Sequence, residues 1–325
     1  MQGEPVIVVT GAAGFLGRAL VPALMRRGYR VRGLVRSLDA ATAARAQFLP
    51  VGDLALVPAR TLANALRGAS VVVHLAARVH QMRDAPAQAQ AEYRLQNVTV
   101  TERLAHAAAD AGVAHFVLAS TVKVNGESTP LRPFVESDPP APSDAYAESK
   151  WAAEQVLAAV AEETRMRATA LRLPLTYGPG AKGNFAALVN AIRRRALLPL
   201  PNVANRRSVL GIGNFCDALG AVVASEDPDG GGRLLPYFLA DAHAVSSLGL
   251  VRAIANALKV VPRVIGVSPG VMLAAGACAG RGAAAARLVE SLEVDASLFG
   301  ARFGWQPPFT LEQGIADAVA TRAPL

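Results

Sequence analysis

The chain has 325 residues, of which 33 are Lys or Arg and 25 are Asp or Glu, giving a formal net charge of +8, and 52% are apolar. This apolar fraction excludes an intrinsically disordered chain, and the presence of only 2 cysteines excludes a small scaffold held by several disulfides. The length suits one large α/β domain or two units of roughly 150 residues. The positive charge allows an anionic partner, whether nucleic acid, anionic lipid or a phosphorylated metabolite.

Targeting signals are not apparent. The N-terminus lacks the basic and long apolar regions of a signal peptide, and no apolar stretch is long enough to span a bilayer. We therefore expect a cytoplasmic protein with no membrane span. The nearest candidate, residues 269–280, is short and rich in small residues, which predicts a packed helix or a lid. Cys216 and Cys278 have no neighbours at metal-ligand spacing, so we expect no metal and two small buried side chains.

The first half of the chain alternates strands with helices. In chain order the pattern predicts a strand over 6–9, a helix over 18–28, a strand over 29–35, a helix over 62–66, a strand over 70–75, a long helix over 91–111, a strand over 115–119, a helix over 145–163 and a strand over 168–173. This βαβ spacing predicts an α/β fold with a Rossmann-type, doubly wound parallel sheet over residues 1–173.

After residue 173 the alternation weakens, and proline and glycine cluster. Strand or helix signals occur over 209–225, 234–239, 244–258 and 312–321. We expect a smaller C-terminal substrate-binding region over 174–325, from which about 208–235 returns to the Rossmann domain.

A glycine-rich turn joins the first strand to the first helix. Gly11 permits the tight turn, Gly14 lets the backbone approach a pyrophosphate, and Gly17 lets the helix pack close to the strand. Phe15 and Leu16, which lie between Gly14 and Gly17, are further candidates for cofactor contact, and the N-terminus of the helix that follows faces the phosphates. The position after a strand and before a helix predicts a dinucleotide site rather than a generic glycine turn.

The end of the second strand bears on the choice of cofactor. An acid there would bind the ribose 2′-hydroxyl of NAD, but the sequence has Arg36, which can hold the 2′-phosphate of NADP. This favours NADP over NAD; the alternative is a solvated arginine. Asp53, followed by Leu54, comes after a strand-like run, where it would accept a hydrogen bond from the adenine amino group or act as a turn residue.

Tyr146 and Lys150 are four residues apart and so share one face of the predicted helix over 145–163. A free tyrosine is a poor acid or base at neutral pH, and an adjacent ammonium would lower its pKa. Thr121 stands at the C-terminal end of the preceding strand, the edge at which ligands bind in such sheets. Together these residues predict a site for proton and hydride transfer, whereas the pair alone would suit a helix surface.

These motifs resemble those of the extended short-chain dehydrogenase/reductases, in the nucleotide-sugar epimerase/dehydratase group. The resemblance covers essentially the whole chain and rests on TGAAGFLG at 10–17, HLAA at 74–77, YAESK at 146–150, RLPLTYGPG at 172–180 and WQPPFTLEQGI at 305–315. It implies that Thr121, Tyr146 and Lys150 form the catalytic triad. It also implies that the cofactor is bound by Leu75, Ala76, Ala77, Asn97, Tyr146, Lys150, Pro174 and Leu175. Tyr177 would line the nicotinamide end and contact substrate, or be a core aromatic.

The sequence departs from one branch of that group. Sugar-nucleotide 4,6-dehydratases have Asp-Glu after the catalytic threonine, whereas here Val122 and Lys123 follow Thr121, so we do not expect dehydration. The segments around Asn125 and 178–185 are similar to those of a bacterial polysaccharide branch that contains UDP-sugar 4-epimerases and 4-keto reductases.

The resemblance also implies a UDP-sugar substrate. Asn184 matches a residue that contacts the diphosphate, and Arg207 matches a phosphate-binding arginine, for which Arg287 is a second candidate. Arg78 and His80 follow the predicted strand over 70–75 and would face the sugar; His80 could instead hydrogen-bond within its loop.

Two reactions at C4 of a UDP-hexose use the same residues. A 4-keto reductase would take hydride from NADPH and a proton from Tyr146, and a 4-epimerase would remove and return the hydride through bound NAD. Arg36 favours the reductase. A non-catalytic NADP-binding regulator is the alternative of a different class, but such proteins often lose the tyrosine or the lysine. We expect no nucleic-acid partner, because no basic stripe or known module appears. The resemblance implies a homodimer formed through the helices over 91–111 and 145–163.

Overall fold

The computed structural model describes residues 6–38, 47–79, 86–226 and 231–320, and it divides into two compact units. The first comprises Met1–Asn125, Pro139–Leu173 and Cys216–Tyr237, and the second comprises Gly126–Asp138, Pro174–Phe215 and Phe238–Leu325. Residues 126–138, which the sequence pattern placed with the first half, cluster with the second unit. Backbone pairing explains this, since Phe134 forms an isolated β-bridge with Val294 and the Thr129 amide donates to the Ser291 carbonyl at 2.8 Å.

A seven-stranded sheet in the order β10-β6-β5-β4-β1-β2-β3 forms the centre of the first unit. Its strands are β1 (Val6–Thr10), β2 (Arg30–Val35), β3 (Phe48–Pro50), β4 (Ala69–His74), β5 (His115–Thr121), β6 (Arg167–Leu173) and β10 (Leu234–Phe238). The pairs β1–β2, β1–β4, β2–β3, β4–β5 and β5–β6 are all parallel. The predicted doubly wound sheet is confirmed, and its order reverses between β1 and β4, where ligands bind in such folds.

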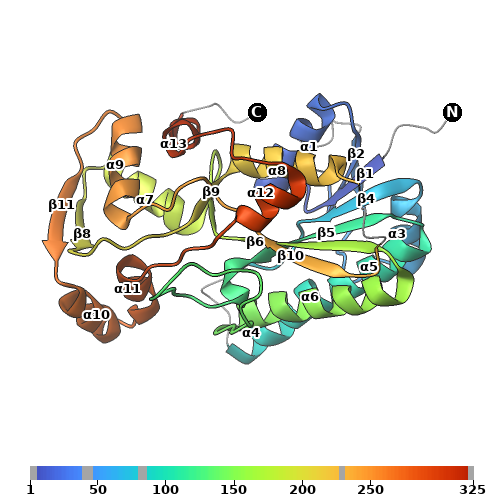
Figure 1. The fold of residues 1–325 in the computed structure, drawn as a ribbon, viewed down its shortest axis with the longest axis horizontal. Helices are drawn as coiled ribbons and strands as arrows, with labels where there is room; N and C mark the ends of the chain where they lie inside the picture. The colour runs from blue at the N-terminus through green and yellow to red at the C-terminus, as the bar shows by residue number, and fades with distance from the viewer. Residues whose placement is uncertain (1–5, 39–46, 80–85, 227–230, 321–325) are drawn as a thin grey trace. The chain divides into compact units, whose positions relative to one another are not determined.

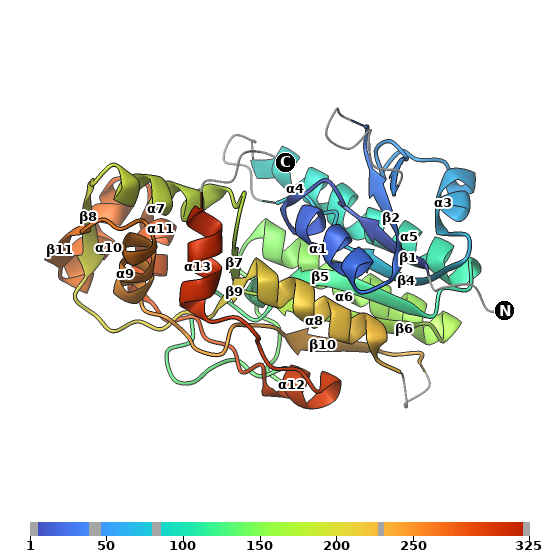
Figure 2. The same cartoon turned by 90° about the horizontal axis from the view of Figure 1, so that it is seen from above.

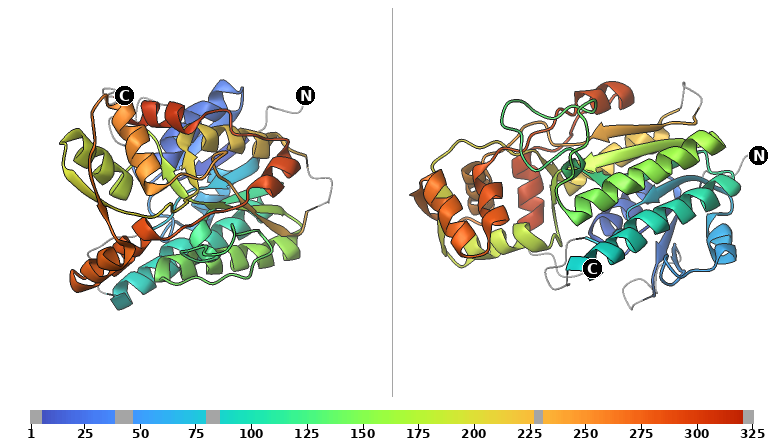
Figure 3. Two further views of the ribbon diagram at one scale, coloured as in Figure 1. Left: turned by 60° about the vertical axis from the view of Figure 1, so that its left-hand side comes forward. Right: turned by 90° about the horizontal axis from the view of Figure 1, so that it is seen from below.

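Helices cover both faces of this sheet (Figures 1 and 2). One face carries α1 (Phe15–Arg26) and α8 (Ile212–Ala224), and the other carries α3 (Ala59–Leu66), α5 (Val100–Asp110) and α6 (Ala145–Thr164). The central strands β1, β5 and β6 are almost wholly buried because parallel sheets need apolar cover on both sides. Helices α5 and α6 lie side by side (Figure 3).

The helix predicted over 91–111 is interrupted. It consists of α4 (Pro86–Tyr93), a π-helical turn (Arg94–Thr99) and α5. The π turn contains Asn97, which is 1% exposed. Such turns often mark functional positions in helices, and hydrophobic periodicity alone does not reveal them.

The second unit contains two small parallel sheets. One pairs β7 (Leu175–Tyr177) with β9 (Val209–Gly211), and the other pairs β8 (Leu197–Pro201) with β11 (Arg263–Val267). Its helices are α7 (Gly183–Arg193), α9 (Ser247–Ala257), α10 (Pro269–Cys278), α11 (Gly282–Val289), α12 (Ser297–Phe303) and α13 (Leu311–Val319). Side chains of α7, α9 and α13, including Phe185, Ile254 and Ile315, form its core.

Helix α10 differs from the expectation of a packed helix. Met272 is its one buried residue, and Cys278 is exposed rather than buried, whereas Cys216 is buried as predicted. The helix packs against α11 through small residues, since a Cβ on Gly276 would lie 2.5 Å from the Cβ of Ala285. Within the described residues, no helix is long and apolar enough to cross a membrane.

Candidate active site

The turn after β1 leaves room for a phosphate and little else. Gly11 has a φ of +65°, and a Cβ there would lie 2.8 Å from the amide nitrogen of Ala76, in the segment after β4. Gly14 is the N-cap of α1, which has no side-chain cap and no acid in its first turn. Uncapped amides at a helix N-terminus attract an anion, so the turn fits the pyrophosphate of a dinucleotide. Phe15 and Leu16 begin α1, so the helix starts earlier than the predicted residue 18.

Gly17 sits where α1 crosses this turn, and a Cβ there would lie 2.3 Å from the Gly11 carbonyl oxygen. We expect Gly17→Ala to displace the turn, to cost on the order of 1–3 kcal/mol of stability, and to weaken dinucleotide binding at least tenfold. Urea unfolding and calorimetric titration with NAD and NADP measure these effects. Gly270→Ala is the control, because no atom lies within 4 Å of its new Cβ. Equal NAD affinity in Gly17→Ala and the wild type would remove this turn from the cofactor site.

The end of β2 carries Arg36, which is largely solvent-exposed and lies 3.7 Å from the Asp53 carboxylate. The other oxygen of that carboxylate accepts from the Ala55 amide at 2.9 Å and from Gln96 at 3.4 Å. Asp53 is thus a turn residue as well as a candidate adenine contact. Leu54 packs against the core of the unit. Because this ion pair is long and exposed, it holds the Arg36 guanidinium only weakly.

A buried hydrogen-bond chain crosses the sheet beside this turn. The Ala76 amide donates to Thr10 Oγ1 (3.2 Å), which contacts His74 Nδ1 (2.6 Å), while His74 Nε2 contacts Thr101 Oγ1 (3.2 Å). Because Thr101 donates its own proton to the Asn97 carbonyl at 2.6 Å, it accepts from Nε2. His74 is then neutral, with its proton on Nε2. No local sequence pattern indicates these hydrogen bonds, which join residues up to 66 positions apart.

Burial, followed by the nearby charge of Lys150, lowers the pKa of His74 to about 3. In the unfolded chain that pKa returns to about 6.5, so the unfolded state binds more protons as the pH falls below that value. We expect this residue to cost about 2 kcal/mol of stability between pH 7 and pH 5. Urea unfolding of the wild type and of His74→Gln at both pH values tests this. An equal pH dependence in the two proteins would show that His74 is not the titrating group.

The three proposed catalytic residues all lie in the first unit. Thr121 ends β5 and is 7% exposed, and Tyr146 and Lys150 occupy successive turns of α6. Asp144 caps α6 by accepting from the Ala147 amide at 2.7 Å, and it also binds Lys123 at 2.6 Å. The segment after Thr121 is thereby joined to the turn that presents Tyr146. Lys123, one of the two residues that stand where dehydratases have Asp-Glu, forms an ion pair with Asp144 here.

The ionisation of this site differs from the expectation that Lys150 lowers the pKa of Tyr146. Burial raises the pKa of Tyr146 to about 12, assisted by the Asp144 charge and by Tyr93, whose ring centroid lies 6.0 Å away. Burial likewise lowers the pKa of Lys150 to about 8, with the charge of Glu154 acting in the opposite direction. Burial therefore dominates the pKa of Tyr146, and at neutral pH Tyr146 holds its proton.

A second buried network lies one helical turn beyond Lys150. Glu154 is fully buried and binds the Arg172 guanidinium through both oxygens, at 2.7 and 3.2 Å. Ser120 also donates to Glu154, and Arg172 donates to Asn125 at 3.0 Å. This network fixes the end of β5, the end of β6 and the helix that carries Lys150. Sequence reasoning missed Glu154 and Arg172, although a Glu four residues after a catalytic Lys was a visible signal.

The side-chain amide of Asn97 joins two segments of the first unit by hydrogen bonds. Its Oδ1 accepts from the Arg78 amide (2.8 Å), and its Nδ2 donates to the Arg78 carbonyl (3.1 Å) and to Ser149 (2.9 Å). Both donors of the amide are therefore used by the protein, so Asn97 positions the segment after β4 against α6. Leu75 and Ala77 lie in that partly exposed segment with Ala76, and Arg78 is 3.7 Å from Glu92.

In the second unit, the structure brings Arg207 and Arg287 together. Arg207 donates to the carbonyls of Arg287 and Glu290, each at 3.1 Å, and burial followed by the Arg287 charge lowers its pKa. Arg287 lies 4.0 Å from Glu127, and its Nε is buried without a hydrogen-bond partner in the described structure. Two adjacent guanidiniums with an unsatisfied donor favour an anion such as a phosphate.

The remaining predicted residues are not gathered with this pair. Tyr177 is 1% exposed in the core of the second unit and donates to Asp241 at 2.8 Å, which corrects its assignment as a substrate contact. Its hydroxyl is held by this partly buried carboxylate. Asn184 is exposed in the first turn of α7, Pro174 is buried and Leu175 is exposed. His80 lies outside the described residues.

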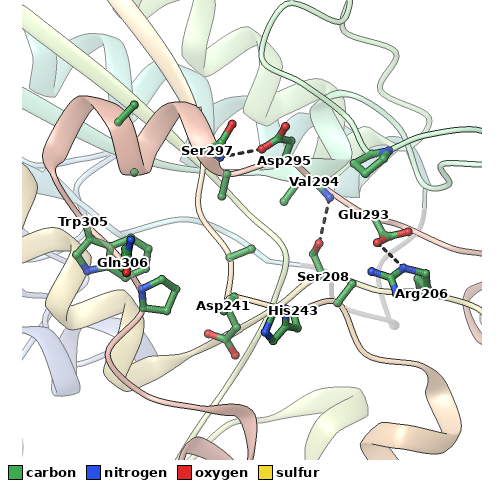
Figure 4. A pocket seen from close by; sticks show the side chains of 18 of the residues that line it. Arg206, Ser208, Asp241, His243, Glu293, Val294, Asp295, Ser297, Trp305 and Gln306 are labelled. Atoms are coloured by element: carbon green, nitrogen blue, oxygen red, sulfur yellow. Dashed lines mark hydrogen bonds and ion pairs between the residues drawn. The ribbon is translucent and has the colours of Figure 1, made fainter.

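The second unit also contains an open pocket of about 980 Å³. Figure 4 shows Trp305 and Gln306 at one side and the Arg206–Glu293 ion pair, 2.8 Å long, at the other. Asp241, on its wall, accepts from Asn214 at 2.7 Å as well as from Tyr177. None of the predicted substrate residues that the structure describes lines this pocket, so its volume alone does not mark the substrate site.

Comparison with known proteins gives a family match and several similar proteins. The model of the NAD dependent epimerase/dehydratase family matches residues 7–235. A UDP-glucose 4-epimerase of Vibrio cholerae is 35% identical over 312 residues, which are 95% of this chain and 93% of that protein. A 4-hydroxy-2-methyl-3-oxo-4-farnesyl-3,4-dihydroquinoline-1-oxide ketoreductase of Stigmatella aurantiaca is 32% identical over 73% of this chain and 68% of its own.

Solved structures have a similar fold. MoeE5 in complex with UDP-glucose and NAD superposes with a TM-score of 0.75 and 26% identity, over 97% of both chains. The UDP-N-acetylglucosamine 4-epimerase of Bacillus cereus has a TM-score of 0.77 at 19% identity, over 97% of this chain and 95% of its own, which supports the fold alone.

Proposed function

Because the chain belongs to the NAD dependent epimerase/dehydratase family, we propose that it is a UDP-hexose 4-epimerase serving polysaccharide sugar-nucleotide synthesis. The observation that carries the proposal is the set Thr121, Tyr146 and Lys150, placed at the C-terminal edge of β5 and on one face of α6. The full-length similarity to an epimerase supports this reaction over net reduction, which the sequence alone had favoured.

The bound nicotinamide cofactor supplies hydride transfer at the sugar carbon. The protein holds its pyrophosphate at Gly11, Gly14 and Gly17, where a side chain would meet backbone atoms. Tyr146 exchanges a proton with the sugar 4-oxygen, and Thr121 donates a hydrogen bond to the same oxygen. Lys150, with its pKa near 8, stays cationic at neutral pH and stabilises the phenolate that forms when the proton leaves.

For the UDP diphosphate we propose Arg207 and Arg287. Their mutual repulsion and the unsatisfied Nε of Arg287 would both be relieved by a dianionic ligand. Replacement of either arginine with Gln should therefore raise KM for the UDP-sugar more than it lowers kcat. We also propose a homodimer formed through α5 and α6.

The 4-keto reductase is the second candidate, and Arg36 is the observation that favours it. A guanidinium at the end of β2, where an acid would select NAD, suits the 2′-phosphate of NADPH, and NADPH suits net reduction. To separate the two, the purified protein is offered UDP-glucose, UDP-N-acetylglucosamine and a UDP-4-keto-6-deoxy sugar. Interconversion of C4 isomers without added cofactor supports the epimerase. NADPH consumption with the keto sugar alone supports the reductase and rejects the epimerase.

A further inference from the structure

Positive charge is concentrated in two segments of the second unit. Residues 174–215 contain six Lys or Arg and no acid, and residues 242–289 contain five and no acid. These segments together carry more positive charge than the whole chain's net +8. Arg207 and Arg287 account for only two of these cations in the proposed diphosphate site.

An apolar surface lies within the same segments. From Val264 to Gly280 there is no charged residue, and most of these residues are exposed even though they form β11 and α10. Val261 is 82% exposed, Ile265 49% and Val271 60%. We call Val261 and residues 264–278, which form most of β11 and all of α10, the apolar strip. Figure 1 shows β11 running directly into α10.

The strip is an ordered surface rather than a frayed end. Strand β11 pairs in parallel with β8 over five residues, and Ser268 caps α10 by accepting from the Val271 amide at 3.4 Å. A helix that is apolar on all sides is normally buried or in contact with lipid. A continuous exposed apolar surface of this kind marks an interaction site.

Cations flank the strip at both ends. Arg263 begins β11 opposite Leu197 of β8, and the exposed run Arg193, Arg194 and Arg195 stands just before Leu197. Arg281 follows α10 and is also exposed. We propose that the apolar strip docks this protein on the surface of a bilayer containing anionic phospholipid, with α10 in the interface and these arginines on the headgroups.

Two features favour a lipid surface over a protein partner. In a symmetric dimer the same surface meets itself, and here neither copy would offer a carboxylate to pair with the arginines. A protein interface also needs roughly one hydrogen bond per 100–200 Å², yet α10 offers only apolar side chains and one cysteine between Pro269 and Cys278. Lipid acyl chains require no such bonds.

The full chain should therefore cosediment with vesicles of phosphatidylcholine and phosphatidylglycerol at low salt, but much less with phosphatidylcholine alone or at high salt. Val271→Glu should lower the partition coefficient about tenfold, and Arg194→Glu or Arg263→Glu about fivefold or more each. Leu131→Glu, at a residue 95% exposed elsewhere in the second unit, is the matched control and should leave binding unchanged.

A second measurement uses the cysteines. Cys278 is exposed on α10 and Cys216 is buried, so alkylation reports on α10, and anionic vesicles should slow it. Absence of binding to anionic vesicles at low salt would overturn the proposal. An equal loss of binding in Leu131→Glu would also overturn it. The same holds if sedimentation equilibrium shows a dimer that does not bind vesicles and that Val271→Glu dissociates.

Discussion

Replacing Tyr146 with phenylalanine is expected to lower kcat by about 10²–10⁴-fold, the usual range for loss of a positioned acid or base. The ring stays in place against Tyr93, so only the exchangeable proton is removed. Activity is measured as UDP-hexose turnover, and retention of the fold is checked by thermal unfolding.

Tyr29→Phe is the matched control for that experiment, since Tyr29 lies in the same unit just before β2 and has no proposed role. Its turnover should equal that of the wild type. If Tyr146→Phe retained full turnover while remaining folded, another group would have to supply the proton and the catalytic assignment would fail.

Glu154→Gln is expected to destabilise the protein by about 3–5 kcal/mol, because it leaves the Arg172 guanidinium without its counterion in the core. The two side chains are 1% and 3% exposed, so solvent cannot compensate. The same change removes the charge that raises the pKa of Lys150. The alkaline limb of the pH–activity profile, if it reports Lys150, should therefore move to lower pH.

The control for the Glu154 experiment is Asp217→Asn, which removes an ion pair with Arg27 whose side chains are 38% and 34% exposed. Exposed pairs contribute about 0–1 kcal/mol, so this variant should unfold almost like the wild type. Equal urea midpoints for Glu154→Gln and Asp217→Asn would show that the buried pair does not stabilise the fold.

Local signals in the sequence predicted much of the first unit. Two of these signals come from residues that are close together in the sequence. One is the spacing of Gly11, Gly14 and Gly17, and the other is the four-residue interval between Tyr146 and Lys150. Periods of two and 3.6 residues then indicate which strands and helices alternate. The doubly wound sheet follows because short βαβ connections leave few other topologies.

Other features depend on contacts between distant segments. Glu154 and Arg172 belong to different elements, and His74 meets Thr10 across 64 positions. The exposure of α10 was also hidden, because an apolar segment gives the same sequence pattern whether it is packed or open. Tyr177 matched a family motif, but its burial beside Asp241 emerged only from the fold.

The proposal that this protein is a UDP-hexose 4-epimerase is tested most directly by measuring whether the hydrogen at C4 is retained during the reaction. The protein is incubated with UDP-hexose deuterated at C4, in ordinary water and without added cofactor, and both C4 isomers are examined by NMR. We predict interconversion with deuterium retained at C4 in each isomer, because the hydrogen moves as a hydride on the enzyme while Tyr146 exchanges only the hydroxyl proton. Loss of deuterium to solvent, or no interconversion at all, would contradict a 4-epimerase that uses these residues.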